Sequence, residues 1–72
     1  MSRLPILSGR AIVKALGKAG DSEVRQRGSH IRLWYAGKKS VTVPDHRAIS
    51  RGLLKKILRD AELSPDEFAE FL

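Results

Sequence analysis

The chain has 72 residues, a length that suits one small domain, and a net charge of +6 at neutral pH. It contains no cysteine, which excludes disulfide bonds and thiolate metal sites and fits a reducing compartment. No apolar run is long enough for a signal peptide or for the roughly 20 residues of a membrane span. We therefore expect a cytoplasmic protein that has no membrane partner.

The basic and acidic residues are distributed unevenly along the chain. All 14 lysines and arginines lie in residues 1–59, together with only three acids, Asp21, Glu23 and Asp45. Residues 60–72 carry the other acids and no basic residue. A basic body followed by an acidic tail is typical of proteins that bind nucleic acids. A small protein whose basic charge serves no binding function is the alternative.

The first predicted element is a helix over residues 9–19, which follows a short entry segment at residues 1–7. Ser8 is placed to cap this helix, and Gly20 stands where a left-handed C-terminal cap is expected. Apolar residues recur at helical spacing and form one stripe, made of Ile12, Val13, Leu16 and Ala19. Basic residues follow at intervals of four on another face, at Arg10, Lys14 and Lys18.

A β-hairpin is predicted next. Residues 22–27 read as a polar strand in which only Val24 is available for burial. The two residues Gly28 and Ser29 then join it to a second strand over residues 30–35, and so short a link is typical of a hairpin turn.

The second strand has a clear alternation of side chains. Ile31, Leu33 and Tyr35 share one face, and the first two are natural core residues. The opposite face brings together an acid–base group, a cation and a flat aromatic ring, from His30, Arg32 and Trp34.

A turn at residues 36–39 leads to a third strand over residues 40–43. Its alternation places Val41 and Val43 toward the core. Pro44 has no backbone N–H, so it ends this strand or marks an edge of the sheet.

Two helices complete the chain. One covers residues 51–61 after the capping residue Ser50, and its buried stripe consists of Leu53, Leu54, Ile57, Leu58 and Ala61. Its other side is basic, with Arg51, Lys55, Lys56 and Arg59. Ser64-Pro65-Asp66-Glu67 is a capping box with proline at the first helical position, and it begins a short acidic helix. The apolar face of this short helix is expected to consist of Phe68, Phe71 and Leu72.

The order of elements predicts the fold class. A helix, three antiparallel strands and a second helix, with core residues on one sheet face only, indicate an α+β protein with two layers. The same αβββα order is found in double-stranded-RNA-binding domains. We therefore expect a fold like that domain, with a short extra C-terminal helix, as a single domain over residues 1–72.

His30 is the principal candidate for catalysis. Histidine has an ordinary pKa of about 6.5, so its imidazole both accepts and donates protons near neutral pH. It can remove the proton of a ribose 2′-hydroxyl or protonate a leaving 5′-oxygen, with Arg27 and Arg32 stabilising charge on the phosphate. The residues alone leave a second interpretation open, in which His30 only hydrogen-bonds its turn or lies on the surface.

Other residues are candidates for binding. Trp34 can stack on an unpaired base, cover the sheet edge or contact a protein. His46, in the loop at residues 45–49, can pair with His30 as acid and base, contact RNA or support its loop. Further candidate RNA contacts are Lys38, Lys39, Lys55 and Lys56. Two histidines and no cysteine form no recognisable metal motif, and the phosphate-binding and dinucleotide motifs are absent, so no metal or cofactor is expected.

These motifs, in this order and spacing, resemble the HicA (YcfA-like) family, the toxin half of HicAB toxin–antitoxin modules. The likeness runs from about residue 8 to residue 68 and rests on the helix at residues 12–20, Arg27-Gly28-Ser29-His30, Val41-Thr42-Val43-Pro44 with His46, and Gly52-Leu53-Leu54-Lys55-Lys56-Ile57-Leu58. The resemblance implies a double-stranded-RNA-binding-like fold, metal-independent cleavage of mRNA, and inhibition by a HicB-like antitoxin. It also implies that His30 is the catalytic histidine and that Gly28 and Ser29 present it.

The sequence leaves two other functions open. The first is a non-catalytic RNA-binding module that uses the same basic face, which predicts salt-sensitive binding without turnover. The second is a protein whose basic face binds an acidic antitoxin, and this function is compatible with cleavage of RNA.

Overall fold

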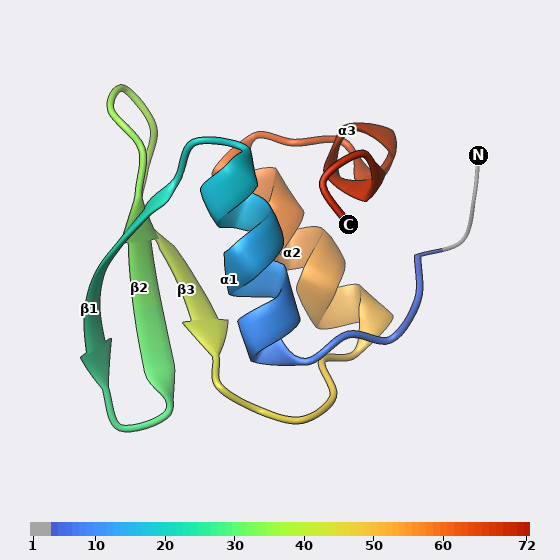
Figure 1. Ribbon diagram of the computed structural model, residues 1–72, viewed down its shortest axis with the longest axis horizontal. Coiled ribbons are helices and arrows are strands. Elements are labelled where there is room, and N and C mark those ends of the chain that lie inside the picture. Colours follow the sequence, from blue (N-terminus) through green and yellow to red (C-terminus); the bar gives the residue numbers. More distant parts are fainter. Residues whose placement is uncertain (1–3) are drawn as a thin grey trace.

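The computed structural model describes residues 4–72 and has the predicted order of elements (Figure 1). The helices are α1 (Gly9–Lys18), α2 (Arg51–Ala61) and α3 (Pro65–Ala69). The strands are β1 (Ser22–Arg27), β2 (His30–Trp34) and β3 (Val41–Pro44). Residues 1–3 of the predicted entry segment lie outside the described residues. Across residues 4–72, no helix is both long and apolar enough to cross a membrane.

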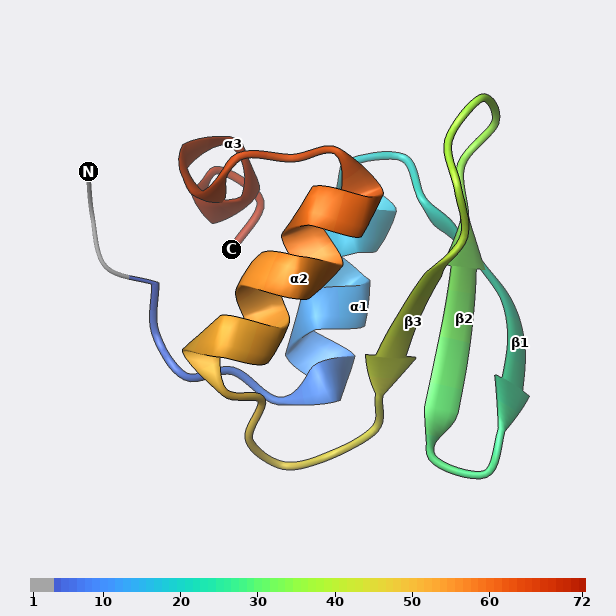
Figure 2. The ribbon, with the colours of Figure 1, turned by 180° about the vertical axis from the view of Figure 1, so that it is seen from behind.

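The three strands form one antiparallel sheet in the order β1-β2-β3. Helices α1 and α2 lie side by side on one face of this sheet, and α3 lies at the far side of α2 (Figures 1 and 2). No helix of the described chain covers the other face, which we name the open face. The predicted two-layer α+β fold, with its αβββα order and short C-terminal helix, is confirmed.

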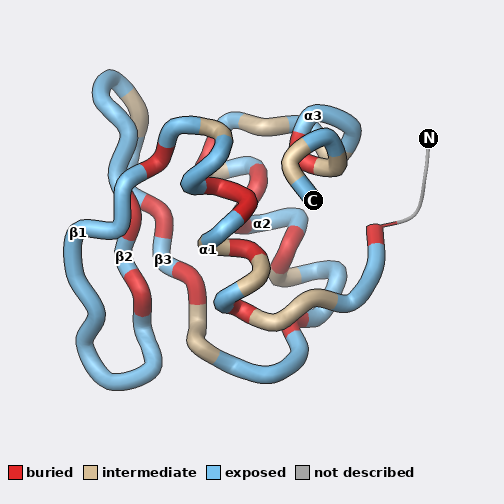
Figure 3. The backbone as a smooth tube through the Cα atoms, in the orientation of Figure 1, coloured by how far each residue is buried: buried red, intermediate tan, exposed pale blue. Residues whose placement is uncertain are grey.

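The hydrophobic core lies between the sheet and the helices, where the buried segments of Figure 3 face one another. Strand β2 alternates as predicted, because Ile31 and Leu33 are fully buried while the residues between them are exposed. Ile49 also belongs to the core, although it lies in a segment predicted as a loop. Its backbone pairs with Leu7 in an isolated bridge, which draws the loop inward.

The helix boundaries follow from local capping. A serine hydroxyl accepts a backbone hydrogen bond at the start of each helix, Ser8 from Ala11, Ser50 from Leu53 and Ser64 from Glu67. The Glu67 carboxylate accepts in return from the Ser64 N–H at 2.8 Å, which completes the predicted capping box. Gly20 after α1 has a φ of 113°, a value that favours glycine, and the Tyr35 ring lies against it.

Two burial predictions are wrong. Val24 is 55% exposed, because β1 is an edge strand with a bulge at this residue and none of its six residues is buried. Leu72 is 50% exposed, because α3 ends at Ala69 and the helical spacing that would align Leu72 with the buried Phe68 does not continue.

Candidate functional site

The turn between β1 and β2 places His30 on the open face. Gly28 has a φ of 58°, in the left-handed region that glycine adopts without strain, and this allows the chain to reverse in two residues. His30 is then the first residue of β2 and pairs with Arg27 across the hairpin. Its side chain is exposed and points away from the core, because its neighbour Ile31 points inward.

A pocket of about 500 Å³ lies beside His30 on the open face. We name it the arginine pocket, and its lining residues are Arg25, Arg27, His30, Arg32 and Thr42. The strand register explains this set, because Arg25, Arg32 and Thr42 are direct neighbours across the three strands and Arg27 and His30 form the next row. The sheet therefore brings three guanidinium groups and one imidazole to the same hollow.

The arginines of this pocket have no carboxylate partner within residues 4–72. No ion pair or side-chain hydrogen bond of the described chain involves Arg25, Arg27 or Arg32. Guanidinium groups are planar donors that fit phosphate oxygens in pairs, so three of them without an internal partner suit a phosphate group.

The bulge in β1 decides which charges face this pocket. In a regular strand Glu23 and Arg25 would share a face, because side chains alternate with a period of two. Here Glu23 lies opposite the buried Leu33, whereas Arg25 lies opposite the exposed Arg32, with Val24 as the extra residue between them. Glu23 consequently pairs with Arg10 of α1 at 3.6 Å, and the open face carries the arginines without this acid.

A family model described as the HicA toxin of bacterial toxin–antitoxin systems matches residues 9–63. The chain belongs to the HicA toxin family. Among solved structures it is similar to a chain of a toxin–antitoxin complex from Streptococcus pneumoniae, with 26% identity and a TM-score of 0.72. That match covers 79% of this chain and 98% of the other, while a search of the curated proteins gave no match.

Trp34 lies on the open face of this HicA-family chain but outside the arginine pocket. It is four residues from His30 along β2, a separation of about 13 Å at the rise of a strand. Its side chain is 49% exposed, and it pairs with Ser22 at the start of β1. The open face thus presents an aromatic surface at one end and the imidazole at the other.

The four lysines predicted to contact RNA are not brought to the pocket. Lys38 donates to the Ala61 carbonyl at 3.2 Å and lies 4.7 Å from the centre of the Tyr35 ring. Lys39 and Lys56 pair with Asp60 at 3.4 and 3.2 Å. Lys38, Lys39 and Lys56 thus form what we name the lysine cluster, and the fourth predicted residue, Lys55, is exposed on α2 in the helix layer.

The acids near the lysine cluster have shifted pKa values. Asp60 has a pKa below its ordinary value, chiefly because Lys56 hydrogen-bonds its carboxylate, with a further contribution from Lys39. Burial raises the pKa of Asp21, against an opposing attraction to Lys38. Neither of these carboxylates lines the arginine pocket.

His46 is not among the residues that line the arginine pocket, and its side chain is exposed. Its backbone carbonyl accepts a hydrogen bond from the N–H of Gly9 at 2.8 Å, so its segment supports the start of α1. In the part of the chain that the structure describes, no group of three or more His, Asp or Glu residues is arranged to hold a metal ion.

Two pocket residues were not singled out from the sequence. Thr42 belongs to the outward side of the third predicted strand, and Arg25 alternates with Arg27 in the first. The sequence did contain an indication of Arg25. Arg27 pairs with His30 across the hairpin, and Arg25, two residues earlier on the strand, shares the face of Arg27.

Proposed function

We propose that this HicA-family toxin is an endoribonuclease that cleaves mRNA and that His30 is its catalytic residue. The observation that carries the proposal is the arginine pocket, where an imidazole stands beside three guanidinium groups that no carboxylate of residues 4–72 neutralises. A phosphodiester is the common substrate for which a proton-transfer group and phosphate-binding cations are needed in one place.

In the proposed mechanism the substrate supplies its own nucleophile. His30 removes the proton of a ribose 2′-hydroxyl, and the 2′-oxygen bonds to the adjacent phosphorus while the bond from phosphorus to the 5′-oxygen breaks. The proton is then returned to the departing 5′-oxygen. Arg27 and Arg32 stabilise the charge that develops on the phosphate oxygens, and no metal ion takes part. The products are a 2′,3′-cyclic phosphate and a 5′-hydroxyl.

Further residues of the open face extend the proposed site. Arg25 adds a third guanidinium on the row of Arg32, where it is placed to hold the phosphate. Trp34 provides a stacking surface for an unpaired base, an interaction worth about 1–3 kcal/mol. Gly28 and Ser29 form the turn that presents His30.

We further propose that a HicB-like antitoxin inhibits the toxin by covering the arginine pocket and that the protein acts in the cytoplasm, where its mRNA substrate lies. The family membership supports this partner, as does the similarity to a chain of a toxin–antitoxin complex. Antitoxin binding is expected to block cleavage and to protect His30 from chemical modification.

The decisive experiment is cleavage of a labelled single-stranded RNA by the purified protein in EDTA, with His30→Ala beside the wild type. We expect the wild type to cut and the folded variant to lose at least about 10²-fold in rate, the scale of general acid–base catalysis. His46→Ala is the matched control, because His46 is exposed and lies outside the pocket. This variant should cleave the RNA at the wild-type rate.

The termini of the fragments test the mechanism itself. Cyclic phosphate ends support attack by the 2′-hydroxyl, whereas fragments that carry only 5′-phosphate ends contradict it. If neither protein cuts but both bind RNA in a salt-dependent way, the chain is a non-catalytic RNA-binding module.

A further inference from the structure

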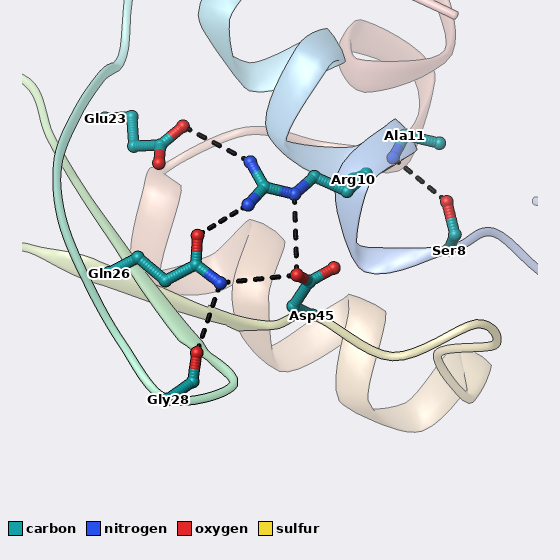
Figure 4. Close-up of polar contacts among 7 residues, drawn as sticks. All are labelled: Ser8, Arg10, Ala11, Glu23, Gln26, Gly28 and Asp45. Carbon is teal, nitrogen blue, oxygen red and sulfur yellow. Dashed lines mark hydrogen bonds and ion pairs between the residues drawn. The ribbon is translucent and has the colours of Figure 1, made fainter.

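A polar cluster that includes Gln26 and Arg10 joins β1 to α1 (Figure 4), and it lies on the face of the sheet opposite the arginine pocket, because Gln26 pairs with the buried Ile31. We name it the Gln26 cluster, and it joins Gln26 of β1, Arg10 of α1 and Asp45, the residue after β3. Arg10 Nη2 donates to Gln26 Oε1 at 2.5 Å, and Arg10 Nε lies 3.6 Å from Asp45 Oδ2. Gln26 Nε2 lies 3.3 Å from Asp45 Oδ2, so the three side chains form a closed set of contacts.

The same cluster holds both carbonyl groups of the turn before His30. Gln26 Nε2 donates to the Gly28 carbonyl at 3.1 Å. The backbone N–H of Asp45 donates to the Ser29 carbonyl at 2.6 Å. A two-residue turn with a hydrogen bond to each carbonyl has little freedom to move, and Ser29 is bonded directly to His30.

The cluster is in turn fixed to the helix layer. The N–H of Gly9 donates to the His46 carbonyl at 2.8 Å, next to Asp45 in sequence. Gly9 is packed so closely against β3 that an added Cβ would overlap the Pro44 carbonyl oxygen. The start of α1 therefore packs closely against the segment that carries Asp45. Through this segment, the turn before His30 is connected to the helix layer and the hydrophobic core.

We infer that Gln26 is a positioning residue, which holds the Gly28–Ser29 turn and thereby fixes where the imidazole of His30 stands in the arginine pocket. The inference rests on the proposed catalytic role of His30. Gln26 does not line the pocket and lies opposite the inward-facing Ile31, so it has no direct contact to make with RNA there. Its contacts are exposed, which limits their value for stability, but small displacements of a catalytic group reduce rates strongly.

The test is Gln26→Leu, which keeps the bulk of the side chain and removes its hydrogen bonds. We expect kcat on a labelled single-stranded RNA to fall roughly tenfold or more, with KM and RNA affinity unchanged. Gln26→Glu separates the contacts of Gln26 from one another, because it keeps an acceptor for Arg10 but has no N–H for Gly28. It should therefore lose as much rate as Gln26→Leu.

Glu23→Gln is the matched control. Glu23 lies on the same strand and the same side and contacts Arg10 but not the turn, so this variant should retain the wild-type kcat. A Gln26→Leu protein that cleaves at the wild-type rate, or one that loses RNA affinity instead of kcat, overturns the inference.

A second measurement does not depend on activity. The N–H of Asp45, which donates to Ser29, should exchange with solvent about tenfold faster in Gln26→Leu, with the ring resonances of His30 shifted in the same variant. Unchanged exchange at Asp45 overturns the inference whatever the activity. If the wild type does not cleave RNA, the proposed function fails, and the exchange rate still decides whether Gln26 holds the turn.

Discussion

Two regions of this protein carry three cationic side chains each, and they differ in the residues that surround those side chains. In the arginine pocket, Arg25, Arg27 and Arg32 share an open face with His30 and have no carboxylate partner in residues 4–72. In the lysine cluster, each cation has a partner within the protein, because Lys39 and Lys56 share the carboxylate of Asp60 and Lys38 donates to the Ala61 carbonyl. Each region holds three cations, but Asp60 offsets one charge in the lysine cluster, whereas no acid of residues 4–72 pairs with the three arginines.

The difference shows that a count of basic residues does not locate a binding site. A cation that already pairs with a carboxylate attracts a phosphate less strongly, because the carboxylate offsets part of its charge and repels the phosphate. The pairing of side chains in the folded chain, and not their number, therefore separates a binding face from a structural one. The comparison can be tested with four sets of variants, in order of decreasing effect.

Removal of one guanidinium from the pocket should have the largest effect. We expect Arg32→Ala to lower the rate of RNA cleavage by about 10²- to 10³-fold, the usual loss when a donor to the transition state is removed. Lys39→Ala removes the same charge from the lysine cluster and should leave the rate unchanged. Equal losses in single-turnover assays of the two variants would contradict the distinction between the regions.

The salt dependence of RNA binding should separate the two regions as well. Each phosphate contact contributes about −0.7 to the slope of log affinity against log salt for a single strand. We expect the double variant Arg25→Ala, Arg27→Ala to reduce the steepness of this slope by about 1.4 in titrations between low and moderate salt. The charge-matched variant Lys39→Ala, Lys56→Ala should keep the wild-type slope, and a flatter slope there would place RNA on the helix layer.

A substitution that destabilises α3 should leave the rate of RNA cleavage unchanged. Ser64→Ala removes the hydroxyl that accepts from the Glu67 N–H at 3.1 Å, which should lower the free energy of unfolding by about 1 kcal/mol. Urea denaturation measures this change, and RNA cleavage below the transition should match the wild type. A parallel loss of activity would show that the two sides of the molecule are coupled.

The pairing of Asp60 predicts the smallest effect, a dependence of stability on pH. The folded pKa of Asp60 lies below its ordinary value of 3.8, chiefly through the hydrogen bond from Lys56, so the ionised carboxylate stabilises the folded state. This contribution is fully present above pH 3.8 and is lost as the pH falls through the folded pKa. Asp60→Asn should therefore be slightly less stable than the wild type at neutral pH, and the difference should vanish in acid.

Thermal denaturation of both proteins between pH 2 and pH 7 measures the convergence. Asp66→Asn is a suitable control, because Asp66 is exposed and makes no ion pair with any residue from 4 to 72. A difference between Asp60→Asn and wild type that persists unchanged at the lowest pH would show that charge is not its cause.

Most elements of the fold were predictable because they depend on neighbouring residues. Ser8, Ser50 and Ser64 cap helices that begin at the next residue, since a cap is decided within one turn of helix. The alternation of β2 was predictable for the same reason, and it placed His30 and Arg32 on the open face. Three motifs in order, around His30, His46 and Gly52, also showed the resemblance to the family that the family model confirms.

By itself, then, the sequence determined the elements, their order, the two-layer class and the family. Only the tertiary structure decided the bulge at Val24, which turns Glu23 toward Arg10 and leaves Arg25 beside Arg32, and the pairing of Lys39 with Asp60. Caps, turns and periodicity are local, so they are visible within a few residues of chain. Cross-strand register and the ion pairs between distant segments depend on residues far apart in the sequence. They form only when those segments pack together, and only then is it decided which cations have a carboxylate partner.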